Sequence, residues 1–344
     1  MNKISDNLNN KFIKKALLYK HLNGKIQCNT CEHKCELKIN QIGFCRTRKN
    51  INNELFTLIY GNISSISNNP IEKKPFFHFH PGTFALTIGS YSCNFTCSWC
   101  QNYSISKTLP KFIDKNYLLP EQLVQLAIKN HSNGLSYSFN EPTLLLEHAI
   151  NSFKIAKKKG LYNTFVSNGY MTIDALKILI DSGLDAINID IKGNWEIVKK
   201  HCNADLNYII RNAKYAKDHG VHVEITTLVI TKLNDNIKIL KEIGLTIKNK
   251  LGKNVPWHLT RYFPHYKYNE PPTSIKILED GMKMAKNLGL NYVYIGNVPG
   301  HNGENTYCPN CKKLIIKRSI FNLVENKIIE NRCPYCKEPI PIII

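Results

Sequence analysis

Three cysteines in one short loop are the residues best suited to chemistry. Cys93, Cys97 and Cys100 have the spacing CxxxCxxC and directly follow an apolar, strand-like run from Phe84 to Ile88. Three thiolates can hold three corners of an iron–sulfur cubane, which usually takes four cysteines. Because the next cysteine along the chain is Cys202, the spacing predicts a cubane with one iron open to an outside ligand. The alternative is part of a zinc knuckle, although zinc sites more often use CxxC pairs.

A second cysteine group lies near the start of the chain, at Cys28, Cys31, Cys35 and Cys45. Four thiolates within eighteen residues are enough to close a tetrahedral metal site, and a segment this small has no core of its own. A structural zinc ion is the first interpretation. A second iron–sulfur cluster and reduced, unliganded thiols are the alternatives.

The C-terminal tail carries two CxxC pairs, Cys308 with Cys311 and Cys333 with Cys336. Two such pairs, each presented by a hairpin turn, are typical of a zinc ribbon that binds one ion through four thiolates. A rubredoxin-like iron site is the main alternative. The solitary Cys202 is interpreted as a buried or incidental thiol.

From Phe84 onward, short apolar runs alternate with longer amphipathic segments. We expect strands at 84–88, 135–139, 164–166, 186–191, 221–230, 257–262 and 291–295. We expect helices at 119–130, 142–159, 172–182, 205–219, 234–250 and 274–288. Strict succession of strand and helix predicts a parallel sheet. Six or seven such units predict an α/β fold, a full or partial (β/α) barrel, with its working residues at the C-terminal ends of the strands.

Polar residues interrupt the apolar sequence pattern where these strands end. We expect them to lie together on the rim of the barrel formed by the C-terminal strand ends, beside the cysteine loop. Taken singly, Ser167 or Asn297 is equally well explained as a helix cap or a turn residue. Asp190 and Lys192 point to the same face of an extended segment and could form an ion pair. The predicted rim contains Asn140 to Thr143, Ser167 to Gly169, Asp190, Lys192, His258, Arg261, His265, Asn297 to Gly300, and His301.

Length and composition limit the possible domain organisation and binding partners. The 344 residues, 43% of them hydrophobic, can bury one large core with small appendages. We expect three parts: an N-terminal Cys-rich subdomain with a connector (1–82), the main domain (83–305) and the ribbon (306–344). The formal charge of +20 permits nucleic-acid binding, but the lysines are spread along the chain, so a general compositional bias explains it equally well.

The cysteines also indicate a compartment. Eleven of the twelve fall into tight groups, which suits metal binding in a reducing environment better than a disulfide framework. No apolar run approaches membrane-spanning length, and residues 1–27 contain no signal-peptide core. We therefore expect a cytoplasmic protein without a membrane partner. The basic segment 11–20 is predicted to form a short amphipathic helix.

The motifs resemble the radical S-adenosylmethionine (radical SAM) superfamily. The order of motifs over nearly the whole chain is similar to one group within it, the radical SAM enzyme of the AmmeMemoRadiSam system, itself similar to pyruvate formate-lyase activating enzymes. The match rests on residues 28–35, 69–75, 93–102, 137–143, 168–169, 190–192, 257–264, 296–297 and the terminal CxxC pairs. Asn140 departs from the superfamily pattern, which has a glycine before the motif's glutamate.

The resemblance implies a [4Fe–4S] cluster at Cys93, Cys97 and Cys100 whose fourth iron is chelated by SAM. Reduction of the bound SAM would give a 5′-deoxyadenosyl radical that abstracts hydrogen from a substrate. Glu141 would meet the SAM amino group. The remaining predicted SAM contacts are Ser167, Asn168, Asp190, Lys192, His258 and Asn297.

Two enzymatic functions follow from this resemblance. The first is an activase or modifying enzyme that acts on a protein or peptide and takes electrons from a low-potential, flavodoxin- or ferredoxin-like donor. The second is a radical SAM enzyme that modifies RNA, suggested by the +20 charge and the ribbon. A non-catalytic metal-binding scaffold is the third interpretation.

Overall fold

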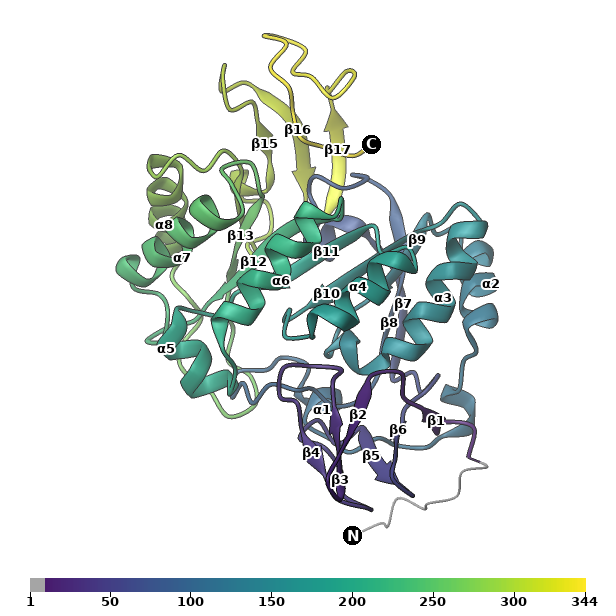
Figure 1. The fold of residues 1–344 in the computed structure, drawn as a ribbon. Helices are drawn as coiled ribbons and strands as arrows, with labels where there is room; N and C mark the ends of the chain where they lie inside the picture. Colours follow the sequence, from purple (N-terminus) through teal and green to yellow (C-terminus); the bar gives the residue numbers. More distant parts are fainter. Residues whose placement is uncertain (1–9) are drawn as a thin grey trace. The chain divides into compact units, whose positions relative to one another are not determined.

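The structure is a computed structural model that describes residues 10–344. The chain has an α/β fold (Figure 1) and divides into two compact units. Unit 1 holds the described residues up to Ser67, with Leu86–Thr96 and Asn102–Asp185. Unit 2 holds Asn68–Ala85, Cys97–Gln101 and Ala186–Ile344. The predicted boundaries at residues 82 and 305 remain predictions.

The strands of unit 1 include two small antiparallel sheets from the N-terminal segment and a set of longer strands. Two further strands, β7 (Ser65–Pro70) and β8 (Phe84–Gly89), are divided between the units. The strands within unit 1 are β1 (Lys14–Lys15), β2 (Tyr19–Leu22), β3 (Lys25–Cys28), β4 (Glu36–Leu37), β5 (Arg48–Ile51), β6 (Glu54–Thr57), β9 (Gly134–Tyr137) and β10 (Tyr162–Ser167).

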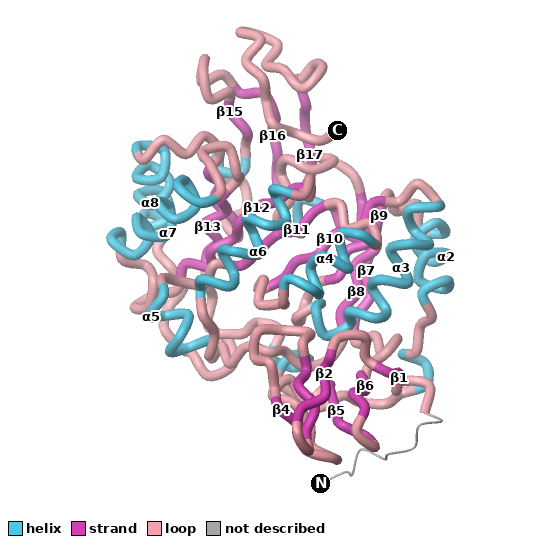
Figure 2. The backbone as a smooth tube through the Cα atoms, in the orientation of Figure 1, coloured by secondary structure: helices cyan, strands magenta, loops and turns pink. Residues whose placement is uncertain are grey.

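Unit 2 has a run of four parallel strands and a small antiparallel tail sheet in the order β15-β16-β17. Figure 2 shows these tail strands between long loops. The strands of unit 2 are β11 (Ala186–Asp190), β12 (His222–Val229), β13 (Trp257–Arg261), β14 (Val293–Gly296), β15 (Thr306–Tyr307), β16 (Leu314–Ser319) and β17 (Asn322–Asn326).

Helices follow the strands in both units. In unit 1 they are α1 (Tyr103–Ser106), α2 (Pro120–Lys129), α3 (Leu146–Lys158) and α4 (Ile173–Asp181), with 3-10 turns at Asp114–Asn116 and Pro142–Leu145. In unit 2 they are α5 (Trp195–Ile197), a π-helical turn at Val198–Cys202, α6 (Leu206–Asp218), α7 (Ile237–Lys250) and α8 (Ile275–Asn287), with 3-10 turns at Ile71–Lys73 and Asn302–Glu304.

Local sequence explains where several helices begin and end. Thr172 caps α4, because its hydroxyl oxygen accepts a hydrogen bond from the backbone N–H of Ala175 at 3.1 Å. Asp205 caps α6 in the same way through the N–H of Asn207. Gly160 and Gly220 follow α3 and α6 with φ of 73° and 80°, a backbone conformation that favours glycine.

The parallel strands carry the core of each unit. In unit 1, β9 and β10 pair in parallel, and α2 and α3 pack beside them (Figure 1). In unit 2, β11, β12, β13 and β14 pair in parallel in that order, and α6 and α8 contact them. Buried aromatic residues fill both cores, among them Tyr137, Phe153 and Phe165 in unit 1 and Trp257 in unit 2. Each such side chain contributes about 1.5–3 kcal/mol by leaving water.

The predicted succession of strands and helices is confirmed, with ends shifted by at most four residues; the largest shift is at α3, where residues 142–145 form a 3-10 turn ahead of the α-helix. One prediction is wrong. Segment 11–20 forms no helix; instead Lys14–Lys15 pairs with β6 and Tyr19–Leu22 pairs with β3. Pairing with the distant strand β6 and with the next strand, β3, satisfies the backbone hydrogen bonds of this segment and so overrides the local helical pattern. None of the helices formed by residues 10–344 has the length and apolar character needed to cross a membrane.

Candidate active site

The cysteine loop is anchored in unit 1 by the side chain of Asn140. Its oxygen accepts a hydrogen bond from the N–H of Ser90 at 2.9 Å, and its amide donates to the carbonyls of Tyr91 and Ser92 at 3.2 and 3.0 Å. Ser92 takes a left-handed conformation with φ of 69°, and Cys93 follows it. The departure from the superfamily glycine therefore supplies three hydrogen bonds that hold the segment just before the first cysteine of the triplet.

Glu141 lies where β9 leads into the 3-10 turn Pro142–Leu145, and its carboxylate is buried. Oε1 accepts hydrogen bonds from the N–H of Thr143 (3.0 Å), the hydroxyl of Thr143 (2.5 Å) and the hydroxyl of Ser167 (2.8 Å). Oε2 accepts from the N–H of Asn168 at 2.9 Å. Burial raises the pKa of Glu141, and these four donors act in the opposite direction. The carboxylate thus joins the ends of β9 and β10.

Asn168 connects this polar cluster to the cysteine loop. Its Nδ2 donates to Oδ1 of Asn94 at 2.7 Å and lies 3.9 Å from Sγ of Cys93. Its Oδ1 accepts from the N–H of Tyr170 at 3.0 Å. The structure therefore places three predicted residues of unit 1, Glu141, Ser167 and Asn168, in one hydrogen-bonded cluster beside Cys93. Their contacts with SAM stay predictions.

Cys97 and Cys100 belong to unit 2, where the loop is held by several contacts. The carbonyl of Ser98 accepts a hydrogen bond from the N–H of Lys267 at 2.9 Å. Trp99 is buried, with its ring 5.8 Å from that of His201 and 6.2 Å from that of Tyr268. Cys97 is buried and Cys100 half-buried.

Asp190 and Lys192 form the expected ion pair, with Nζ and Oδ2 3.0 Å apart. Burial acts to lower the pKa of Lys192, but the Asp190 carboxylate and the thiols of Cys97 and Cys202 outweigh it, so the pKa is raised. A cation that stays charged beside Cys97 favours the thiolate, which is the form that binds metals. Whether the pair rearranges when SAM binds stays a prediction.

His258 contacts a carboxylate that the sequence analysis missed. Its Nε2 lies 2.6 Å from Oε2 of Glu224, and Nε2 of His222 lies 3.0 Å from Oε1. The same carboxylate accepts hydrogen bonds from the N–H groups of Phe77 and His78, at distances of 2.7–3.0 Å. Burial acts to raise the pKa of Glu224, but the hydrogen bonds from the two histidines outweigh it and hold the pKa well below its usual range.

The sequence did contain a signal for Glu224. A single charge inside the otherwise apolar and neutral strand segment 221–230 marks a buried charge that needs partners. Asn297, the last predicted contact, follows β14 in a left-handed conformation with φ of 58°. Its Nδ2 donates to the carbonyl of Arg261 at 3.0 Å and so joins the ends of β13 and β14.

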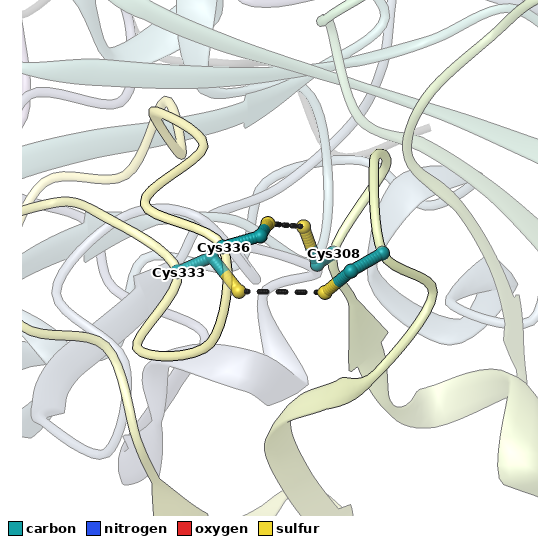
Figure 3. Close-up of side chains that lie close together, drawn as sticks. Cys308, Cys333 and Cys336 are labelled. Atoms are coloured by element: carbon teal, nitrogen blue, oxygen red, sulfur yellow. Dashed lines mark hydrogen bonds between the residues drawn. The ribbon is translucent and has the colours of Figure 1, made fainter.

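The four tail cysteines converge in unit 2 (Figure 3). The Sγ atoms of Cys308, Cys311, Cys333 and Cys336 all lie within 4.8 Å of one another. Cys308 and Cys336 are 3.5 Å apart, and Cys311 and Cys333 are 3.7 Å apart. Four thiols at this spacing suit one tetrahedral metal ion. The backbone N–H of Glu338 lowers the pKa of Cys336 to about 6, which favours the thiolate; zinc as the occupant stays a prediction.

The four N-terminal cysteines line one pocket of unit 1, together with His33, Phe44 and Arg48. Cys28, Cys31 and Cys45 are buried, and Cys35 is half-buried. Arg48 is buried as well and donates from Nη1 to Oε1 of Glu147 at 2.6 Å. The structure thus brings the whole predicted quartet to one place.

Two known proteins are similar to this chain over most of its length. The chain is 41% identical over 336 residues to the uncharacterized protein MJ0808 of Methanocaldococcus jannaschii, covering 96% of this chain and 100% of that protein. It is 26% identical over 296 residues to the uncharacterized protein MJ0674 of the same organism, covering 78% of this chain and 76% of that protein.

Among solved structures, the chain is similar to a domain of pyruvate-formate lyase-activating enzyme from Bacteroides vulgatus, at 17% identity and a TM-score of 0.42. That match covers 48% of this chain and 100% of that domain. The family model of the radical SAM superfamily matches residues 87–243, the part of the chain that runs from the cysteine loop through α7. The chain therefore belongs to the radical SAM superfamily.

Proposed function

We propose that this protein cleaves SAM reductively at a [4Fe–4S] cluster and abstracts hydrogen from a protein or peptide substrate, as an activase or modifying enzyme. The observation that carries the proposal is the contact between Asn168 and Cys93, with Nδ2 3.9 Å from Sγ. It brings the buried carboxylate of Glu141 and the first cysteine of the CxxxCxxC motif into one hydrogen-bonded cluster.

The residues of this cluster fit the implied groups by their chemistry. Cysteine thiolates are the ordinary ligands of iron in such clusters. Within the described part of the chain, Oε1 of Glu141 accepts three hydrogen bonds and Oε2 accepts one. A carboxylate has about four lone-pair sites on its two oxygens, so Oε2 retains the capacity to accept a bond from an ammonium group.

The proposal gives each residue of the site a role. Cys93, Cys97 and Cys100 would hold the cluster, and Glu141 would orient the SAM amino group. The cluster and SAM, when bound, supply a one-electron reduction of the sulfonium that releases methionine and a 5′-deoxyadenosyl radical. The low-dielectric surroundings of Glu141, which is buried, and of Lys192, which is half-buried, would strengthen their interactions with the charged ends of SAM. The remaining predicted contacts are Ser167, Asn168, Asp190, His258 and Asn297.

Anaerobic reconstitution with iron and sulfide, followed by dithionite and SAM, tests the proposal. We expect 5′-deoxyadenosine to form, and we expect deuterium to enter it from a deuterated partner protein or peptide recovered by pull-down. A protein fully loaded with cluster that forms no 5′-deoxyadenosine would contradict the proposal and favour a metal-binding scaffold.

The second candidate substrate is RNA, which the +20 charge favours. Neutralising phosphates with Lys and Arg releases counterions, so RNA binding would fall steeply as salt is added. Two results together would identify RNA, and not a protein or peptide, as the substrate. They are saturable binding of one RNA class with that salt dependence, and transfer of deuterium from labelled RNA to 5′-deoxyadenosine.

A further inference from the structure

The N-terminal cysteine quartet has the features of a thiolate site, with hydrogen-bond donors at its sulfurs. The thiol of Cys28 donates to the hydroxyl of Thr30 at 3.6 Å, and Cys45 Sγ shares a hydrogen bond with the hydroxyl of Thr47 at 3.2 Å. The N–H of Phe44 donates to Cys35 Sγ at 3.4 Å. Such donors stabilise thiolates bound to metal.

A buried cation lies beside the same sulfurs. The guanidinium of Arg48 lines the pocket and interacts electrostatically with Cys28 and Cys45. Arg48 is also paired with Glu147, through the 2.6 Å contact between Nη1 and Oε1. A buried positive group next to four thiols favours an anionic occupant, as a thiolate-bound metal centre is.

The two cysteine quartets differ in how closely their sulfur atoms lie together. In residues 10–344, the tail cysteines are the one group of three or more metal-ligating side chains whose ligand atoms all lie within 4.8 Å of one another. A single zinc ion with bonds of about 2.3 Å draws four thiolates that close together. The N-terminal sulfurs surround a common pocket at wider spacing, as four ligands on four different irons of a cubane must.

The quartet's segment also contacts the residues on either side of Cys93. The backbone carbonyl of Asn94, which follows Cys93, lies 2.7 Å from Nε2 of His33. The hydroxyl of Ser92 donates to the carbonyl of Cys45 at 2.6 Å. One residue, Asn94, is therefore bonded covalently to Cys93 and contacts His33, which lines the pocket of the quartet.

We propose that Cys28, Cys31, Cys35 and Cys45 bind a second [4Fe–4S] cluster that passes electrons through the Asn94 contact to the active-site cluster. The inference rests on the proposed function for the identity of the electron acceptor. One electron moves from a reduced flavodoxin- or ferredoxin-like donor to the second cluster, and from there to the active-site cluster. No bond forms or breaks at the quartet. Cys35, the half-buried cysteine of the four, is the nearest of them to solvent and to such a donor.

The metal content of the triple variant C93A/C97A/C100A tests the site without disturbing the quartet. We expect this variant, isolated anaerobically, to keep about four irons per chain and to show the electron paramagnetic resonance signal of a reduced cubane. Zinc in place of iron at the quartet would overturn the inference. Because this variant lacks the active-site cysteines, its result does not depend on whether the proposed function is correct.

A second measurement tests the electron path. In the variant C28A/C31A, we expect 5′-deoxyadenosine formation driven by a reduced ferredoxin to fall much more than formation driven by dithionite, which reaches clusters without a protein path. The double variant C333A/C336A, in the tail quartet, serves as the matched control and should leave the ratio of the two rates unchanged. Equal losses with both reductants in C28A/C31A would contradict electron transfer through the quartet.

Discussion

The sulfur atoms of Cys97 and Cys202 lie 3.6 Å apart in a buried part of unit 2. Cys202 ends the π-helical turn Val198–Cys202 and is followed by Asn203 in a left-handed conformation with φ of 55°. Single π turns inside helices often occur at functional sites. A thiol this close to a proposed cluster ligand is a hydrogen-bonding neighbour of that ligand, because two ligands on different irons of a cubane are held further apart.

Replacing Cys202 therefore tests its role directly. We expect Cys202→Ser to retain the iron content of the wild type, because the residue is a neighbour of the cluster and not a ligand. After oxidative loss of the cluster, we expect the wild type to form a Cys97–Cys202 disulfide, detected by peptide mapping under non-reducing conditions and absent from the variant. Loss of iron from Cys202→Ser would instead identify a fourth protein ligand and would leave no iron open to SAM.

Glu141→Gln tests the buried carboxylate at the ends of β9 and β10. The substitution places an amide NH2 among donors from Thr143, Ser167 and Asn168, and unmatched buried donors cost about 1–3 kcal/mol of unfolding free energy. We expect the variant to unfold at lower denaturant concentration and, once reconstituted, to bind SAM more weakly by calorimetry. Glu54→Gln, at a surface ion pair with Lys15, is the matched control. If Glu141→Gln bound SAM with the affinity of the wild type, the prediction that Glu141 contacts SAM would be wrong.

The pKa of Glu224 predicts a loss of stability in acid. Because the folded state holds this pKa below the ordinary value of 4.5, the ionised carboxylate stabilises the fold at pH values above about 4.5, and this contribution is lost as the pH falls further. Denaturant unfolding measured across this range should show the loss. In Glu224→Gln the acid dependence should be smaller, and unfolding at neutral pH should cost about 1–3 kcal/mol less, because the amide leaves buried hydrogen-bond donors without a full set of acceptors. An unchanged acid dependence in the variant would show that other groups control it.

Metal removal tests the tail quartet. Cys308 and Cys333 belong to a buried cluster with Tyr292, Ile315 and Ile316, so an ion at the quartet stabilises the packing around it. We expect one zinc per chain at this site, and a lower melting temperature when a chelator removes it or when Cys333 is replaced by Ser. The iron content should not change in Cys333→Ser. Iron with a rubredoxin-like visible spectrum would show that the zinc assignment is wrong.

Sequence and structure agree best where the information is local. The strands and helices from residue 84 onward were predicted because apolar runs, amphipathic segments and helix-ending residues such as Gly160 and Gly220 act over a few neighbours. The local sequence pattern gave a wrong prediction, a helix, for segment 11–20. Its residues pair with β3 and β6, and short strands take their conformation from partners that a local pattern does not contain.

By itself, the sequence determined the α/β succession, the three cysteine groups and the superfamily, because each depends on residue type and spacing along the chain. Only the tertiary structure decided which distant groups meet. Cys202 lies beside Cys97, Glu224 holds two histidines and two backbone N–H groups, and Asn94 contacts His33 in the segment of the N-terminal quartet. Such contacts arise from packing and from the need of buried polar groups for partners, and sequence spacing does not encode the distances between them.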